Sequence, residues 1–168
     1  MNIVEKSKKY ACESHANTNH YYDFDKPYST HLNMVYNIAK HFISLVNDED
    51  QDNVLAACWT HDIIEDARQT YDDVLKNTNK TIADITYALT NEKGKNRKER
   101  ANNKYFEGIR NIPNSSFVKL CDRIANVTYS KKNKSPMFIK YKKENSIFVK
   151  SIDQFGLKPM IQYLDDIS

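Results

Sequence analysis

The chain has 168 residues and a net charge of +3, and 40% of its residues are hydrophobic while 28% are charged. These values predict one globular domain, residues 1–168, with a sizeable core. Such a small net charge gives no argument for a nucleic-acid partner, and no stretch approaches the roughly 18 apolar residues of a membrane span. Only 3 Gly and 4 Pro argue against an all-β domain, which needs many turns.

The three cysteines, Cys12, Cys58 and Cys121, are scattered and odd in number. They form neither a disulfide framework nor a zinc knuckle, which favours a reducing compartment. Residues 1–6 contain no apolar stretch of the kind found in a secretory signal peptide. We therefore expect a cytoplasmic protein, and the sequence leaves the oligomeric state open.

Apolar residues at helical spacing predict helices along most of the chain, and the strands of a βαβ unit are absent. A first helix is expected over residues 2–17, before a polar and aromatic segment that ends at Pro27. A second is expected to begin near Ser29, a good N-cap residue. Further helices are expected around residues 54–66, 70–75, 81–89, 105–109, 117–127, 137–151 and 160–164. The fold class is therefore all-α, with roughly eight to nine helices.

The second helix carries an apolar stripe at helical period, made of His31, Val35, Ile38, Phe42 and Leu45. His31 is the first residue of this core-facing stripe. A histidine in that position is either satisfied by a backbone carbonyl or serves as a metal ligand. The stripe by itself leaves both interpretations open.

The next helix begins with an apolar run over residues 54–59 that has no polar face and is expected to be buried on all sides. It leads into His61, Asp62, Glu65 and Asp66. Charged groups are almost never buried unless they are paired or bind a metal. In a continuous helix His61 and Glu65 would share one face. This stretch predicts the bottom of an active site; the alternative is a capped helix end with a solvated acidic turn.

Two later segments carry further candidate residues. Asp122 lies at the edge of the apolar stripe of residues 117–127, and Lys119 and Asn126 share its face. A carboxylate in that place needs a partner, which a metal would supply. Residues 93–100 form a basic connector, which is either a solvated face or a rim that holds anions.

Three predicted helices thus bring one candidate group each to the core: His31, His61 with Asp62, and Asp122. Two imidazoles and two carboxylates suit a first-row divalent cation with water in the open positions. The set contains no thiolate, which argues against a structural zinc site.

Three motifs in this order resemble those of the RelA/SpoT-type hydrolase domains, which are HD-domain metal-dependent phosphohydrolases. Residues 27–31, PYSTH, resemble the family's Pro-Tyr-x-x-His opening, and residues 61–66, HDIIED, resemble its His-Asp-x-x-Glu-Asp box. Residues 118–126, VKLCDRIAN, resemble its Val-Lys-Leu-Ala-Asp-Arg-x-x-Asn segment. The resemblance covers residues 5–150 and is closest to small alarmone hydrolases without a synthetase or regulatory domain.

The resemblance implies a cofactor of one Mn²⁺ ion per chain, held by His31, His61, Asp62 and Asp122. It also implies that Glu65 and Asp66 serve the attacking water.

Substrate contacts are expected from residues around this centre. Tyr28 is expected to pack on the nucleoside and Asn126 to bond a ribose hydroxyl, while Lys119 and Arg97 would hold phosphates. The family carries an Arg-Lys pair that contacts the base, whereas this chain has His20 and Tyr21 there. Histidine does not replace an arginine fork at equal strength. The base preference, guanine or adenine, is therefore open.

The function predicted from the sequence is removal of the 3′-pyrophosphate from a (p)ppGpp-like alarmone, with a small-molecule nucleotide as substrate. One alternative is an HD-type nucleotidase or cyclic-nucleotide phosphodiesterase. Another is a non-catalytic nucleotide-binding module, against which the intact pair of Glu65 and Asp66 argues, because sequestration needs no poised water.

Overall fold

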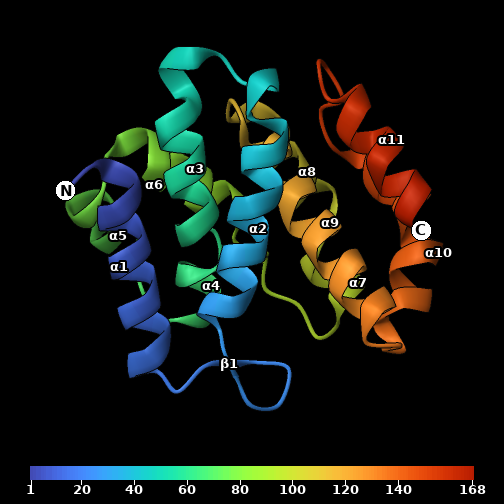
Figure 1. Cartoon of the computed structure of the whole chain (residues 1–168), viewed down its shortest axis with the longest axis horizontal. Helices are drawn as coiled ribbons and strands as arrows, with labels where there is room; N and C mark the ends of the chain where they lie inside the picture. The colour runs from blue at the N-terminus through green and yellow to red at the C-terminus, as the bar shows by residue number, and fades with distance from the viewer.

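The computed structural model describes residues 1–168 and is an all-α bundle with one small hairpin (Figure 1). Nine helices have seven residues or more, which confirms the predicted number. They are α1 (Ile3–Asn17), α2 (Ser29–Phe42), α3 (Gln51–Thr60), α5 (Tyr71–Asn77), α6 (Lys80–Leu89), α8 (Asn103–Asn111), α9 (Ser115–Lys132), α10 (Met137–Ser151) and α11 (Lys158–Ile167). The short elements are the one-turn helices α4 (Ile63–Asp66) and α7 (Arg97–Arg100), the 3₁₀ turns η1 (Ile43–Leu45) and η2 (Asp48–Asp50), and the antiparallel strands β1 (Tyr21–Tyr22) and β2 (Lys26–Pro27).

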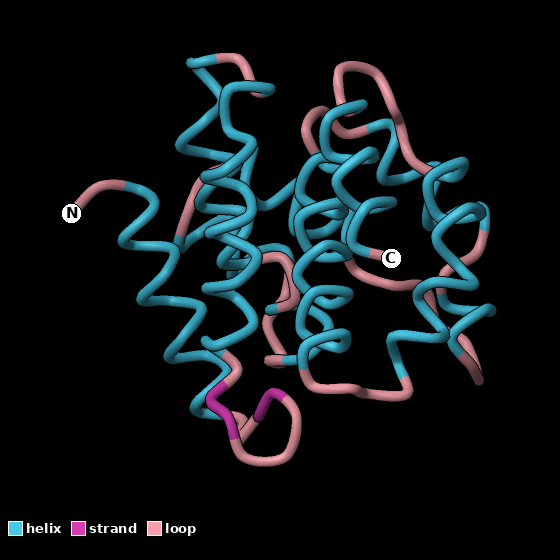
Figure 2. The backbone as a smooth tube through the Cα atoms, turned by 45° about the vertical axis from the view of Figure 1, so that its right-hand side comes forward, coloured by secondary structure: helices cyan, strands magenta, loops and turns pink.

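Helix α3 lies at the centre of the bundle, between α1 and α2 and against α6 and α9. Helix α9 packs in turn on α2, α10 and α11. The hairpin of β1 and β2 projects from one end of the bundle, below the start of α2, and the two chain ends lie on opposite sides (Figures 1 and 2). No helix is both long and apolar enough to cross a membrane.

The central place of α3 follows from its composition. Its residues Val54 and Ala56–Thr60 are all buried, as the apolar run predicted. An element that is apolar on every side is stable only where neighbours cover every side. The same burial brings the end of α3, and the charged residues that follow it, into the interior.

Three details differ from the prediction. Helix α3 ends at Thr60, and His61 and Asp62 form a turn before α4 begins, so a continuous helix over 54–66 was wrong. Tyr28, not Ser29, is the N-cap of α2 and makes no side-chain capping bond. Pro159 lies in the first turn of α11, where its missing N–H costs no hydrogen bond, so that helix begins before the proline.

Candidate active site

Four predicted ligands converge where α2, the α3–α4 turn and α9 meet. The Nε2 atoms of His31 and His61 are 3.3 Å apart, and the Nε2 of His61 is 3.0 Å from Oδ2 of Asp62. Oδ1 of Asp122 lies 3.3 Å from the Nε2 of His31 and 3.8 Å from that of His61. Both imidazoles are buried, and so is Asp122. Residues from three separate segments therefore aim their donor atoms at one point.

The donor set fits a divalent cation. Ligands at 2.0–2.2 Å from one ion lie about 3 Å apart when they are at right angles, and the observed separations run from 3.0 to 3.8 Å. The other ring nitrogen of His61, Nδ1, lies 2.9 Å from the carbonyl oxygen of Cys58. A proton on Nδ1 donated to that carbonyl leaves the lone pair of Nε2 facing the cluster, which is the arrangement of a metal-binding histidine. One ligand atom from each of His31, His61 and Asp122 lies within 4.8 Å of the other two, which is close enough for a single ion to bind all three.

The charges of the cluster explain its titration behaviour. Burial lowers the pKa of His31, but the hydrogen bonds and charges of Asp122 and Asp62 outweigh it and raise the pKa to about 9. Burial raises the pKa of Asp122, yet Lys119 and the two imidazoles hold it well below its usual range. Against the effect of burial, the imidazoles of His61 and His31 likewise hold the pKa of Asp62 well below its usual range. Two ionised carboxylates thus remain inside the fold, and they need positive charge beside them.

Each ligand carboxylate is also held by neighbours. The hydroxyl of Tyr28 donates to Oδ2 of Asp62 at 2.5 Å. Lys119 Nζ lies 2.9 Å from Oδ2 of Asp122, and Asn126 Nδ2 donates to its Oδ1 at 2.6 Å. The predicted substrate contacts Tyr28, Lys119 and Asn126 therefore bond the ligand carboxylates in this structure. Groups that orient ligands in this way strongly affect metal affinity.

The sequence did not predict that Tyr22 contacts the ligand cluster. Its ring stacks on His31 with centroids 5.0 Å apart, and its hydroxyl donates to Oδ1 of Asn126 at 3.1 Å. The hairpin brings this residue to α2 and α9, and nothing in the local sequence signals that contact. Tyr22 closes the hairpin side of the cluster.

The two acidic residues of α4 lie in different environments. The carboxylate of Glu65 is exposed and accepts hydrogen bonds from the backbone N–H and the side-chain amide of Asn91, at 3.2 and 2.8 Å. Asp66 lies nearer the cluster, with Oδ2 3.4 Å from the hydroxyl of Tyr28. Burial and the nearby charges of Asp62 and Glu65 raise the pKa of Asp66 to about 7. Asp66 is therefore a carboxyl group able to exchange a proton near neutral pH.

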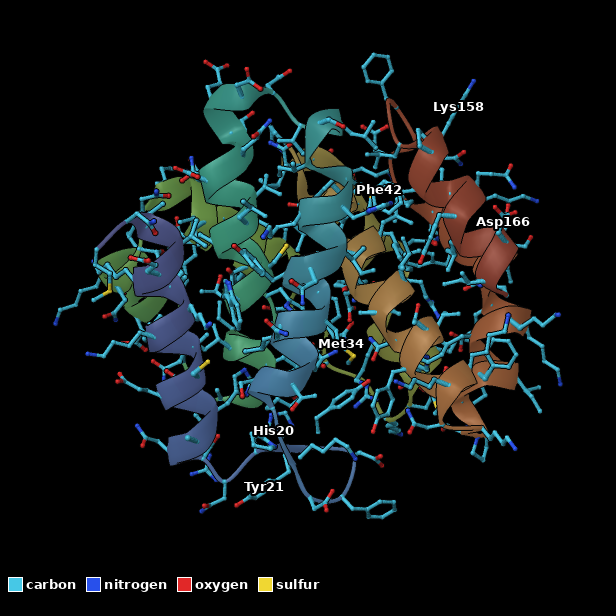
Figure 3. All side chains as sticks on the ribbon, in the orientation of Figure 1. His20, Tyr21, Met34, Phe42, Lys158 and Asp166 are labelled. Atoms are coloured by element: carbon cyan, nitrogen blue, oxygen red, sulfur yellow. The ribbon has the colours of Figure 1, made fainter.

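The other predicted contacts lie further out. His20 stacks on Tyr28, with centroids 4.1 Å apart, whereas Tyr21 is 53% exposed; both lie at the hairpin end of α2 (Figure 3). Arg97 on α7 forms an ion pair with Glu144 on α10, with Nη2 and Oε2 3.1 Å apart. None of the hydrogen bonds of Arg97 reaches the four ligands.

An all-α bundle that encloses a buried His/Asp cluster is the architecture that the motifs predicted. Among solved structures, one described as a metazoan ortholog of SpoT that hydrolyses ppGpp and plays a role in starvation responses has the same fold. The TM-score is 0.71 with 19% sequence identity, over 99% of this chain and 94% of that one. No family model matches the sequence, and no curated protein matches it either. The likeness in structure confirms the predicted fold.

Proposed function

We propose that this chain is a metal-dependent phosphohydrolase that removes the 3′-pyrophosphate from a (p)ppGpp-like alarmone. The observation that carries the proposal is the convergence of two imidazoles and two carboxylates from three segments of the chain. Each imidazole Nε2 lies 3.0–3.8 Å from the other and from one oxygen of each carboxylate. The structural likeness to a protein described as hydrolysing ppGpp supports the choice of substrate class.

Mn²⁺ is the proposed ion, held by His31, His61, Asp62 and Asp122. Mixed imidazole and carboxylate ligands suit first-row divalent cations. When bound, such an ion would lower the pKa of a coordinated water and polarise a phosphoryl oxygen. The residues of the chain then decide where protons go and how the ligands are held.

Asp66 and Glu65 are the proposed proton-handling pair. Asp66, with its pKa near 7, accepts a proton from the attacking water. The oxygen of that water bonds to phosphorus while the bond from phosphorus to the ribose 3′-oxygen breaks, and the proton that Asp66 accepted is returned to the leaving 3′-oxygen. Glu65, exposed and next to Asp66 in α4, orients the water or relays that proton. Tyr28 keeps Asp62 in place throughout.

The raised pKa of Asp66 favours an enzyme over a non-catalytic nucleotide-binding module. A half-buried carboxyl group beside two other acids lowers the stability of the fold, and binding of a nucleotide alone does not require such a group. A nucleotidase or phosphodiesterase of the same fold would use the same donors, so the substrate distinguishes these candidates.

The test is hydrolysis by metal-stripped protein reloaded with Mn²⁺, Mg²⁺ or Zn²⁺, on a panel of ppGpp, ppApp, NADPH and cyclic nucleotides. We expect pyrophosphate release from ppGpp or ppApp, fastest with Mn²⁺ and abolished in Asp122→Ala. Release of phosphate from another nucleotide alone would favour the alternative enzymes. No turnover of any member of the panel would overturn the proposal.

A further inference from the structure

His15, on α1, is a buried histidine that the proposed chemistry does not use. It is 1% exposed, and its ring stacks on Tyr28 with centroids 4.3 Å apart. Its Nδ1 lies 3.0 Å from Nδ1 of His20, while its Nε2 is buried and has no hydrogen-bond partner. His20 stacks on the same tyrosine, so three rings form one cluster beside Asp62.

The position of the protons in this pair follows from the unpartnered nitrogen. Each neutral imidazole carries one N–H and one lone pair. A buried N–H without an acceptor is rare, whereas a buried lone pair without a donor is better tolerated. The proton of His15 therefore lies on Nδ1 and is donated to Nδ1 of His20. As Nδ1 of His20 accepts, the proton of His20 lies on Nε2.

Burial keeps both rings neutral, as this assignment requires. It lowers the pKa of His15 to about 4, and it also lowers the pKa of His20. Near neutral pH each ring then holds a single proton. The 3.0 Å contact between the two Nδ1 atoms can form only if one of them donates and the other accepts.

The Nε2 of His20 is free to meet a ligand. The ring is half-buried, Nε2 makes no hydrogen bond inside the protein, and Tyr28 connects the ring to Asp62. Tyr21 and Phe24, at 53% and 94% exposure, present further aromatic surface on the same hairpin. Flat rings beside one fixed donor suit a heteroaromatic base that carries an acceptor.

We propose that His15 is a positioning residue that fixes His20 as the Nε2–H tautomer, so that His20 donates a hydrogen bond to an acceptor on the substrate's base. The tautomer follows from the contact between the two Nδ1 atoms and from the burial of the His15 ring with its unpartnered Nε2. The identity of the acceptor rests on the proposed function.

The tautomers are measurable without turnover, by long-range ¹H–¹⁵N correlation spectra of histidine-labelled protein at pH 7.5 with diamagnetic Mg²⁺. His15 is expected to show a protonated Nδ1 and a bare Nε2, and His20 the reverse pattern. In His15→Leu the resonances of His20 should report a mixture of tautomers, whereas His15→Asn, whose side-chain amide can replace the Nδ1–H donor, should restore the single form. A bare Nδ1 on His15 in the wild-type spectrum would overturn the assignment.

Steady-state kinetics with Mn²⁺ and ppGpp test the second half of the proposal. His15→Leu and His20→Phe should each raise KM about tenfold and leave kcat within about twofold, the pattern of a lost binding contact. The double variant should be no worse than either single variant, because both remove the same contact. An unchanged KM in His20→Phe would show that His20 does not contact the substrate. If the wild type hydrolysed nothing, the proposed function would fail, and addition of ppGpp to the labelled protein would still decide whether the Nε2–H of His20 meets a ligand.

Discussion

The hydroxyl of Tyr28 donates a 2.5 Å hydrogen bond to Oδ2 of Asp62, the carboxylate oxygen that also faces His61 at 3.0 Å. Tyr28 is the N-cap residue of α2, and Asp62 lies in the turn that follows α3. The bond therefore joins the start of one helix to the end of the other across the candidate metal site. It also limits the directions in which Asp62 can turn.

Replacing Tyr28 by Phe should raise the Kd for Mn²⁺ by roughly 10- to 100-fold, the usual effect of removing a group that orients a ligand. The fold should persist, because one hydrogen bond to a charged carboxylate contributes only about 1.5–3 kcal/mol. Electron paramagnetic resonance of free Mn²⁺ during a titration measures the affinity. Tyr87→Phe is the matched control, since Tyr87 is 61% exposed and away from the cluster. Equal affinities for the two variants would contradict the role of Tyr28.

Asp122→Ala should abolish metal retention and turnover while it leaves the helix content largely intact. The variant removes a ligand oxygen 3.3 Å from Nε2 of His31 and leaves the half-buried Lys119 without its partner. Metal content by mass spectrometry and helix content by circular dichroism measure the two effects. A variant that kept its metal and its full rate would disprove the ligand assignment.

Glu65→Gln should retain the metal but lower kcat by about a hundredfold or more, the scale of a general acid–base group. Glutamine has one acceptor oxygen, so it can keep one of the two hydrogen bonds from Asn91, and because residue 65 is exposed the local structure should survive the loss of the other. Glu107→Gln, an exposed residue on α8, serves as the control. A near wild-type rate for Glu65→Gln would make Glu65 structural, and Asp66→Asn would then show whether Asp66 acts alone.

The free energy of unfolding should fall at acid pH through His15. Its folded pKa of about 4 lies below the unfolded value of 6.5, so the unfolded chain binds the proton more readily. The contribution of neutral His15 to the free energy of unfolding is fully present above pH 6.5. As the pH falls towards 4, the free energy of unfolding decreases by up to about 3 kcal/mol through this residue. Urea unfolding of wild type and His15→Leu across this range measures it. The free energy of unfolding of the wild type should fall relative to that of His15→Leu as the pH falls. A pH-independent difference between the two free energies would rule the effect out.

Guanine and adenine versions of one alarmone should be hydrolysed with kcat/KM values within about tenfold of each other, or about 1.4 kcal/mol. A single donor on His20 can meet N7, an acceptor that both purines carry, whereas an arginine fork would read two acceptors at once. Paired kinetics on ppGpp and ppApp decide the point. A thousandfold preference for guanine would show that another group supplies the missing contact.

The sequence by itself determined the fold class, most helix positions and the four clustered candidate ligands. Helical periodicity and the all-apolar run over 54–59 depend on local chemistry, which a linear pattern records. The order of the three motifs placed His31, His61, Asp62 and Asp122 on separate segments, and their convergence followed from burying those segments together.

Only the tertiary structure decided how these residues are supported. The break after Thr60 turns Glu65 towards Asn91, and the hairpin brings Tyr22 onto His31. The pairing of His15 with His20 depends on how the end of α1 meets the hairpin. Such contacts arise when whole elements pack together. The apolar periodicity of one element predicts which face is buried but not which residues pack against that face.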